Sequence, residues 1–88
     1  DHMDVAAILS DMAAEYHARN QFDEALQALK EALRIQRAAL AVDHSSVATT
    51  LANIGSVYES RGEYKEALHF YADALQIRKV EADADDLD

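Results

Sequence analysis

The apolar residues of the chain recur every three or four positions over four separate stretches, with polar residues between them. This spacing places the apolar side chains of each stretch on one face of a helix. We expect these faces to pack together into a core. They consist of Val5, Leu9, Met12 and Tyr16; Phe22, Leu26, Leu29 and Leu33; Val47, Leu51, Ile54 and Tyr58; and Tyr64, Leu68, Tyr71 and Leu75. The pattern predicts helices over residues 4–19, 22–41, 46–60 and 64–81.

Residues at the expected ends of these helices support the limits. Asn20 follows the first predicted helix and Gly62 follows the third, and both residue types accept the left-handed conformation that ends many helices. Three residues are N-cap candidates for the third helix: Asp43, Ser45 and Ser46. Small residues lie beside the apolar face of each second helix and predict close helix–helix contacts. They are Ala25, Ala32, Ala67 and Ala74.

The second half of the chain repeats the first at a distance of 42 residues, so that Val5-Ala6 corresponds to Val47-Ala48 and Tyr16 to Tyr58. Repeats of this length are typical of folds built from stacked helical pairs. The sequence therefore predicts an all-α fold of two tandem antiparallel helix–turn–helix repeats, at residues 4–45 and 46–81. Two interpretations of residues 1–3 stay open, a remnant of an expression vector or an N-terminal cap. Residues 82–88 are expected to form an acidic disordered tail.

Charge and composition exclude several classes of function. The net charge is −9, and no basic stripe of the kind that binds nucleic acid or an anionic membrane surface is present. No apolar run approaches the ~20 residues that span a bilayer. The chain contains no cysteine, which excludes disulfides and thiolate chemistry. We expect a soluble, cytoplasmic protein that binds neither nucleic acid nor membranes.

Groups that could support catalysis or metal binding do not form a recognisable pattern. The four histidines lack the i, i+4 spacing of a helical zinc site; they are His2, His17, His44 and His69. The serines show no accompanying histidine and acid of a catalytic triad. The acidic tail lacks the glycine that a calcium-binding loop requires. We therefore expect no enzyme activity, no cofactor and no metal site.

The residues that the two copies share resemble the tetratricopeptide repeat. The characteristic positions are Leu51, Ile54-Gly55, Tyr58, Ala67, Tyr71 and Ala74 in the second copy, and Leu9, Met12-Ala13, Tyr16, Ala25, Leu29 and Ala32 in the first. The period exceeds the common one of about 34 residues, and it is similar to the variety found in kinesin light chains. The resemblance implies a fragment of a right-handed α-solenoid, cut from a larger scaffold or adaptor, whose first helices line a concave surface that binds a peptide or protein.

The resemblance also implies which residues form the peptide-binding groove. They are Asp11, Ala14, His17, Thr49, Asn53, Ser56 and Glu59. Asn53 is the strongest candidate, because its amide both donates and accepts hydrogen bonds and can bracket a peptide unit; the alternative is an ordinary solvated asparagine. Because Asp11 and Glu59 are acidic, we expect a neutral or basic partner rather than an acidic one.

One subgroup of the family clamps a C-terminal carboxylate with lysine, arginine and asparagine side chains. The matching positions here hold Ala7, Asp11, Thr49 and Asn53. Only Asn53 fits that pattern, and Asp11 would repel a carboxylate. We therefore expect no clamp of this type.

Self-association is the second interpretation of function. Stacked repeats usually need about three units, and the last predicted helix carries more apolar surface than one neighbouring helix can cover. Its expected end-face interface is formed by Leu68, Phe70, Tyr71, Leu75 and Ile77. Exposed apolar surface of this kind marks interfaces, and a further repeat, a binding partner or a second copy of the chain could cover it. A homodimer is the alternative function. Residues 40–46 lack Gly and Pro, and two chains could exchange halves through this segment.

Overall fold

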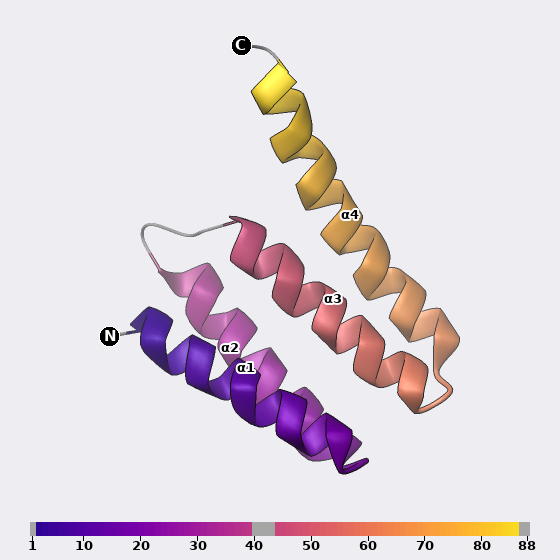
Figure 1. Ribbon diagram of the computed structural model, residues 1–88. Helices are drawn as coiled ribbons and strands as arrows, with labels where there is room; N and C mark the ends of the chain where they lie inside the picture. Colours follow the sequence, from indigo (N-terminus) through magenta and orange to yellow (C-terminus); the bar gives the residue numbers. More distant parts are fainter. Residues whose placement is uncertain (1, 40–43, 87–88) are drawn as a thin grey trace.

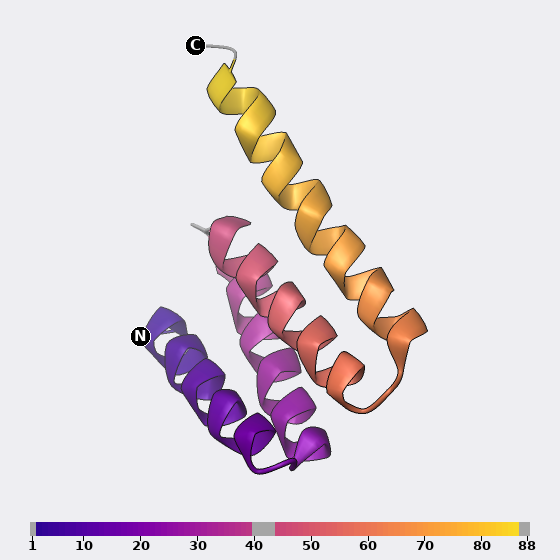
Figure 2. The ribbon, with the colours of Figure 1, turned by 45° about the vertical axis from the view of Figure 1, so that its right-hand side comes forward.

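The computed structural model describes residues 2–39 and 44–86, which form four helices (Figure 1). They are α1 (His2–Ala18), α2 (Phe22–Ala38), α3 (His44–Ser60) and α4 (Tyr64–Asp86). Each helix packs against the next one along the chain, and Figure 2 shows α1 and α4 at opposite ends of the stack. The predicted all-α fold of two helical pairs is confirmed. No helix in the described part of the chain is long and apolar enough to cross a membrane.

The turns inside the two pairs have the same geometry. Asn20 has a φ of 62° and Gly62 a φ of 82°, so both adopt the predicted left-handed conformation. The next amide then donates back to the last turn of the helix, from Gln21 to the Tyr16 carbonyl at 2.8 Å and from Glu63 to the Tyr58 carbonyl at 2.9 Å. These bonds satisfy carbonyls that the helix end leaves without a partner.

Alanines bring the paired helices close together. The four alanines of the second helices are all buried, as the sequence predicts: Ala25, Ala32, Ala67 and Ala74. The largest fully buried side chains are those of Leu29, Leu51, Ile54 and Val57. The core therefore lies along α2 and α3, the two inner helices of the stack.

Part of the predicted apolar faces does not enter the core. Val5 and Met12 of α1 are exposed, as are Tyr64, Leu68 and Leu75 of α4. Val5, Met12 and Tyr64 are therefore not the core residues that their apolar faces predicted, whereas the exposed Leu68 and Leu75 belong to the surface of the last helix that was expected to stay uncovered. The reason for this exposure is that α1 and α4 are the outer helices and each packs closely against one neighbour only. Periodicity identifies an apolar face but does not show whether another helix covers it.

Each helix differs from its expected limits at one end or both, and the first runs from His2 to Ala18 instead of over residues 4–19. The second helix ends at Ala38, three residues early, and the third begins at His44. Ser45 and Ser46 therefore lie inside α3 rather than at its N-cap, while residue 43 and most of the segment considered for exchange of halves lie outside the described residues. The fourth helix continues to Asp86, through residues expected to be disordered, and alanine is the strongest helix former among them.

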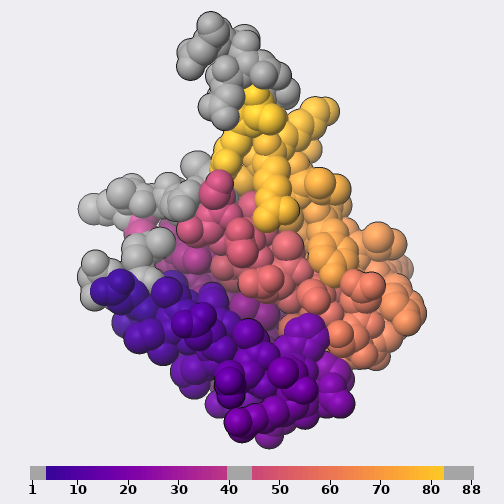
Figure 3. Space-filling model, in the orientation of Figure 1, coloured from indigo at the N-terminus to yellow at the C-terminus, as the bar shows by residue number. Residues whose placement is uncertain are grey.

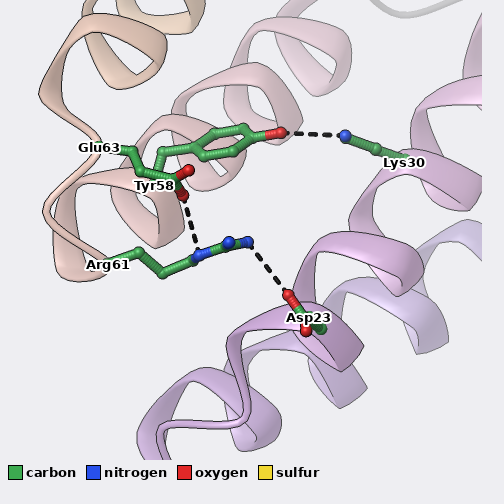
Figure 4. Close-up of polar contacts among 5 residues, drawn as sticks. All are labelled: Asp23, Lys30, Tyr58, Arg61 and Glu63. Atoms are coloured by element: carbon green, nitrogen blue, oxygen red, sulfur yellow. Dashed lines mark hydrogen bonds and ion pairs between the residues drawn. The ribbon is translucent and has the colours of Figure 1, made fainter.

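Polar contacts hold the two copies in register across the α2–α3 interface. Thr50 Oγ1 donates to Gln36 Oε1 at 2.8 Å, and both residues are buried. At the other end of the interface, Arg61 lies 3.1 Å from an Asp23 carboxylate oxygen (Figure 4). Between them, Lys30 Nζ donates to the Tyr58 hydroxyl at 3.0 Å. Because buried polar atoms must be paired, the Gln36–Thr50 bond penalises any shift of one helix along the other.

Candidate functional site

The first helices of the two copies adjoin on one face of the molecule, which Figure 3 views in space-filling form. A cavity of about 110 Å³ lies between α1 and α3 on this face. It is lined by Ser10, Ala13, Ala14, His17, Leu29, Asn53, Ser56 and Val57. The cavity exists because most of the side chains that α1 and α3 place over the inner helix α2 are alanines and serines.

The floor and the rim of this cavity differ in polarity. Leu29 of α2 and Val57 of α3 are buried and provide apolar floor residues. The rim carries the hydroxyl groups of Ser10 and Ser56 and the amide of Asn53. Ligand pockets that hold a small molecule usually exceed about 300 Å³. This cavity is smaller and suits one apolar side chain surrounded by hydrogen-bonding groups.

His17 closes one end of the cavity and connects the two copies. Its Nε2 lies 2.8 Å from Ser60 Oγ at the end of α3. Its ring meets Phe22 edge to face, with centroids 5.8 Å apart. These two contacts hold the imidazole in one orientation at the rim.

A second, larger hollow of about 330 Å³ continues along the same face. It is lined by Ala7, Ser10, Gln36, Ser45, Ser46, Thr49, Thr50 and Asn53. Ser10 and Asn53 line both cavities, so the Asn53 amide lies between them. We call the continuous strip formed by the residues of both linings the α1–α3 face.

The structure brings most of the predicted groove residues together. Ala14, His17, Asn53 and Ser56 line the smaller cavity, and Thr49 lines the larger one. The two predicted acids, Asp11 and Glu59, are exposed and line neither cavity. Sequence reasoning missed the floor residues, because their role depends on where the cavity opens over α2. It also missed Gln36. The one indication in the sequence was a polar residue within the apolar stripe of the second helix.

Charge is absent from the linings of the two cavities. Neither contains Lys, Arg, Asp or Glu. The groups available there are hydroxyls, amides and one imidazole, which bind a polar backbone rather than an ion. Within the described residues, no group of three or more His, Asp or Glu side chains could hold a metal ion.

The predicted end-face residues separate into two groups. Phe70 and Ile77 are half-buried and pack against the core, and the Phe70 ring stacks on Tyr58 with centroids 5.5 Å apart. Leu68 and Leu75 point into solvent. The end face of α4 is therefore narrower than expected.

Tyr71 belongs to the first of these groups, because it reaches across to α3. Its hydroxyl donates to Glu59 Oε1 at 2.7 Å. Partial burial, and then the hydrogen bond and negative charge of Glu59, raise the pKa of Tyr71 above its ordinary value. The hydroxyl therefore remains a donor at neutral pH, and the ring lies directly over Gly55.

Comparison with known proteins agrees with this architecture. A family model described as tetratricopeptide repeat matches residues 4–79. The match therefore covers most of each of the four helices and the whole α1–α3 face. No curated protein matches the chain.

Proposed function

Since this chain belongs to the tetratricopeptide-repeat family, we propose that the α1–α3 face binds an extended peptide or protein segment. Repeats of this family are protein–protein interaction modules and are typically non-catalytic. The observation that carries the proposal is the position of Asn53 between two uncharged cavities. An amide in that place can donate to a carbonyl and accept from an N–H of the same peptide unit.

The two cavities give the bound segment a direction along the helices. A side chain of the peptide enters the smaller cavity and contacts Leu29 and Val57 at its floor. The backbone then passes Asn53 and continues over the larger hollow beside Thr49. Small residues such as Ala14 support this arrangement, because they let a backbone approach the helices closely.

The charges around the face favour a neutral or basic partner. The linings contain no cation that could neutralise an acidic peptide, and the exposed carboxylates of Asp11 and Glu59 lie on the first helices beside them. The chain as a whole carries a net charge of −9. A basic segment gains from this field at long range, whereas a C-terminal carboxylate meets repulsion.

Selection from a phage-displayed library of random peptides tests the proposal. We expect the selected peptides to be neutral or basic and to bind Asn53→Ala about tenfold more weakly than the unmodified chain, a loss of about 1.4 kcal/mol. Gln76→Ala is the matched control, because it removes an exposed amide from α4. Peptides that bind both variants as tightly as the unmodified chain would show that the α1–α3 face is not the binding site.

Self-association through the end face of α4 is the second candidate function, and one observation favours it. Leu68 and Leu75 are exposed by 68% and 66% although they lie on the same helix as core residues. Isolated exposed leucines are common, but two on one face of a helix form a patch that another helix can cover. A homodimer formed in this way would show a mass that rises with concentration.

A further inference from the structure

Both ends of the helical stack expose apolar side chains. The outer side of α4 carries Leu68 and Leu75, and the outer side of α1 carries Val5, Ile8 and Met12. We call these the α4 end face and the α1 end face. Their residues contribute little to the core of the chain itself.

The α4 end face repeats a surface that the chain already uses internally. Leu68 and Leu75 correspond, 42 residues earlier, to Leu26 and Leu33. In α2 these two leucines are only 6% and 8% exposed. Because the equivalent residues of α4 remain exposed beside their own pair partner, the burial of the leucines in α2 is due to α3.

The α1 end face repeats the other half of the same interface. Val5, Ile8 and Met12 correspond to Val47, Thr50 and Ile54, all of which are buried in α3. The chain thus carries at its two ends the two halves of its own α2–α3 interface. The apolar residues of the two end faces therefore lie at the positions that pack against each other in the α2–α3 interface.

At the positions equivalent to the polar cluster of the internal interface, the two end faces carry charges of opposite sign. Internally, Gln36 bonds to Thr50 and lines one hollow with Ser46 and Asn53. The equivalent of Gln36 in α4 is Arg78. The residues of α1 equivalent to Ser46, Thr50 and Asn53 are Asp4, Ile8 and Asp11. In the same register, an arginine therefore lies beside two carboxylates.

The opposite end of the interface is less complementary. The internal pair Asp23–Arg61 is replaced by Lys65 and Arg19, which are both cations. The buried Val57 is replaced by Glu15, which pairs with Arg19 at 3.3 Å. These two replacements weaken the contact relative to the internal interface, so an association formed in this way is reversible.

We propose that two copies of this chain associate head to tail, with the α4 end face of one copy on the α1 end face of the next, in the register of the α2–α3 interface. This inference rests on the self-association described above and specifies its geometry. The contact is heterologous, so each added copy leaves one α1 end face and one α4 end face open. Assembly therefore continues beyond a dimer.

Sedimentation across a concentration series tests the association itself. The mass of the unmodified chain should rise with concentration and pass that of a dimer. Leu68→Glu and Ile8→Glu should each remain monomeric, because each places a carboxylate in the centre of one end face. Val80→Glu is the matched control, because Val80 is exposed on another side of α4, and it should behave like the unmodified chain. A chain that stays monomeric throughout overturns self-association and the head-to-tail arrangement together.

Mixing the two monomeric variants tests the geometry. Leu68→Glu keeps an intact α1 end face and Ile8→Glu keeps an intact α4 end face, so an equimolar mixture should form a dimer that grows no further. A symmetric dimer through α4 alone predicts that Ile8→Glu still dimerises by itself. That result, or a mixture that stays monomeric while the unmodified chain associates, overturns the head-to-tail arrangement but leaves self-association standing.

Glu15→Val provides a test in the opposite direction. It restores the residue type of Val57 at the weak end of the interface and should strengthen association about tenfold. Folding of every variant is checked by circular dichroism, and all of the substituted residues are exposed. No change, or weaker association by folded Glu15→Val, contradicts the proposed register.

Discussion

Adding a methyl group at Gly55 should destabilise the chain, although the first copy carries an alanine at the equivalent position. A Cβ added there would lie 3.0 Å from Tyr71 Cε1 and 3.1 Å from the Ala67 carbonyl oxygen. Real Cβ contacts are rarely this short. The first copy carries a buried alanine, Ala13, at the equivalent position, and it has Leu29 where the second copy has Tyr71. The glycine is therefore needed because of the tyrosine ring.

The size of the effect follows from two opposing terms. Replacing glycine by alanine inside a helix stabilises it by about 1 kcal/mol. Overpacking a tight contact costs about 1–3 kcal/mol. Relief is restricted, because the Tyr71 hydroxyl is bonded to Glu59 and the Ala67 oxygen is part of the backbone. We expect Gly55→Ala to lower the free energy of unfolding by up to about 2 kcal/mol.

A double-mutant cycle with Tyr71→Leu isolates this contact. Tyr71→Leu alone loses ring packing and a hydrogen bond, and should destabilise the chain by about 1–3 kcal/mol. The double variant recreates the Ala13–Leu29 arrangement of the first copy. It should therefore be more stable than the sum of the single changes predicts, by about 1–2 kcal/mol.

Urea unfolding followed by far-ultraviolet circular dichroism gives all four free energies. Ala13→Gly in the first copy is the control, and it should cost about 1 kcal/mol from helix propensity alone. The reasoning is refuted if Gly55→Ala stabilises the chain by about 1 kcal/mol whether residue 71 is Tyr or Leu. Additive free energies would mean that the ring does not restrict the glycine.

Three further predictions concern polar contacts. Because burial and Glu59 raise the pKa of Tyr71, the folded state holds the hydroxyl proton more tightly than the unfolded state; this stabilisation is present below pH 10 or so and is lost as the pH rises through the folded value. The urea midpoint of the unmodified chain should therefore fall as the pH rises above about 10, and the midpoint of Tyr71→Phe should fall less steeply over the same range. Thr50→Val leaves the buried Gln36 oxygen without its donor and should cost about 1–3 kcal/mol of unfolding free energy, most of which Gln36→Leu should restore in the same chain. Arg61→Ala should cost about 1 kcal/mol, because Arg61 pairs with two carboxylates, the exposed Asp23 at 3.1 Å and the half-buried Glu63 at 2.9 Å, and the difference should shrink when unfolding is measured in high salt.

Local signals made much of the fold predictable. The turns end on Asn20 and Gly62, because a left-handed residue is favourable for only a few residue types. The buried alanines were predictable from their place beside each apolar stripe. Repetition over 42 residues then set the number of helical pairs.

Other features depend on neighbours that periodicity does not reveal. Tyr64 and Tyr58 occupy equivalent kinds of apolar position, yet Tyr64 is exposed and Tyr58 packs against Phe70. Residues of the second helices, such as Leu29, enter the candidate site only because α1 and α3 leave a cavity above them. The sequence does not show which side of an apolar helix face a neighbouring helix covers.

A nuclear magnetic resonance titration with one peptide from the random library tests the proposed binding face most directly. The account predicts that backbone amide shifts change first along α1 and α3, at Ser10, His17, Asn53 and Ser56, while residues on the outer side of α4 change little. Shifts concentrated at Leu68 and Leu75, with the α1–α3 face unaffected, would contradict it and would locate binding at the end of the stack.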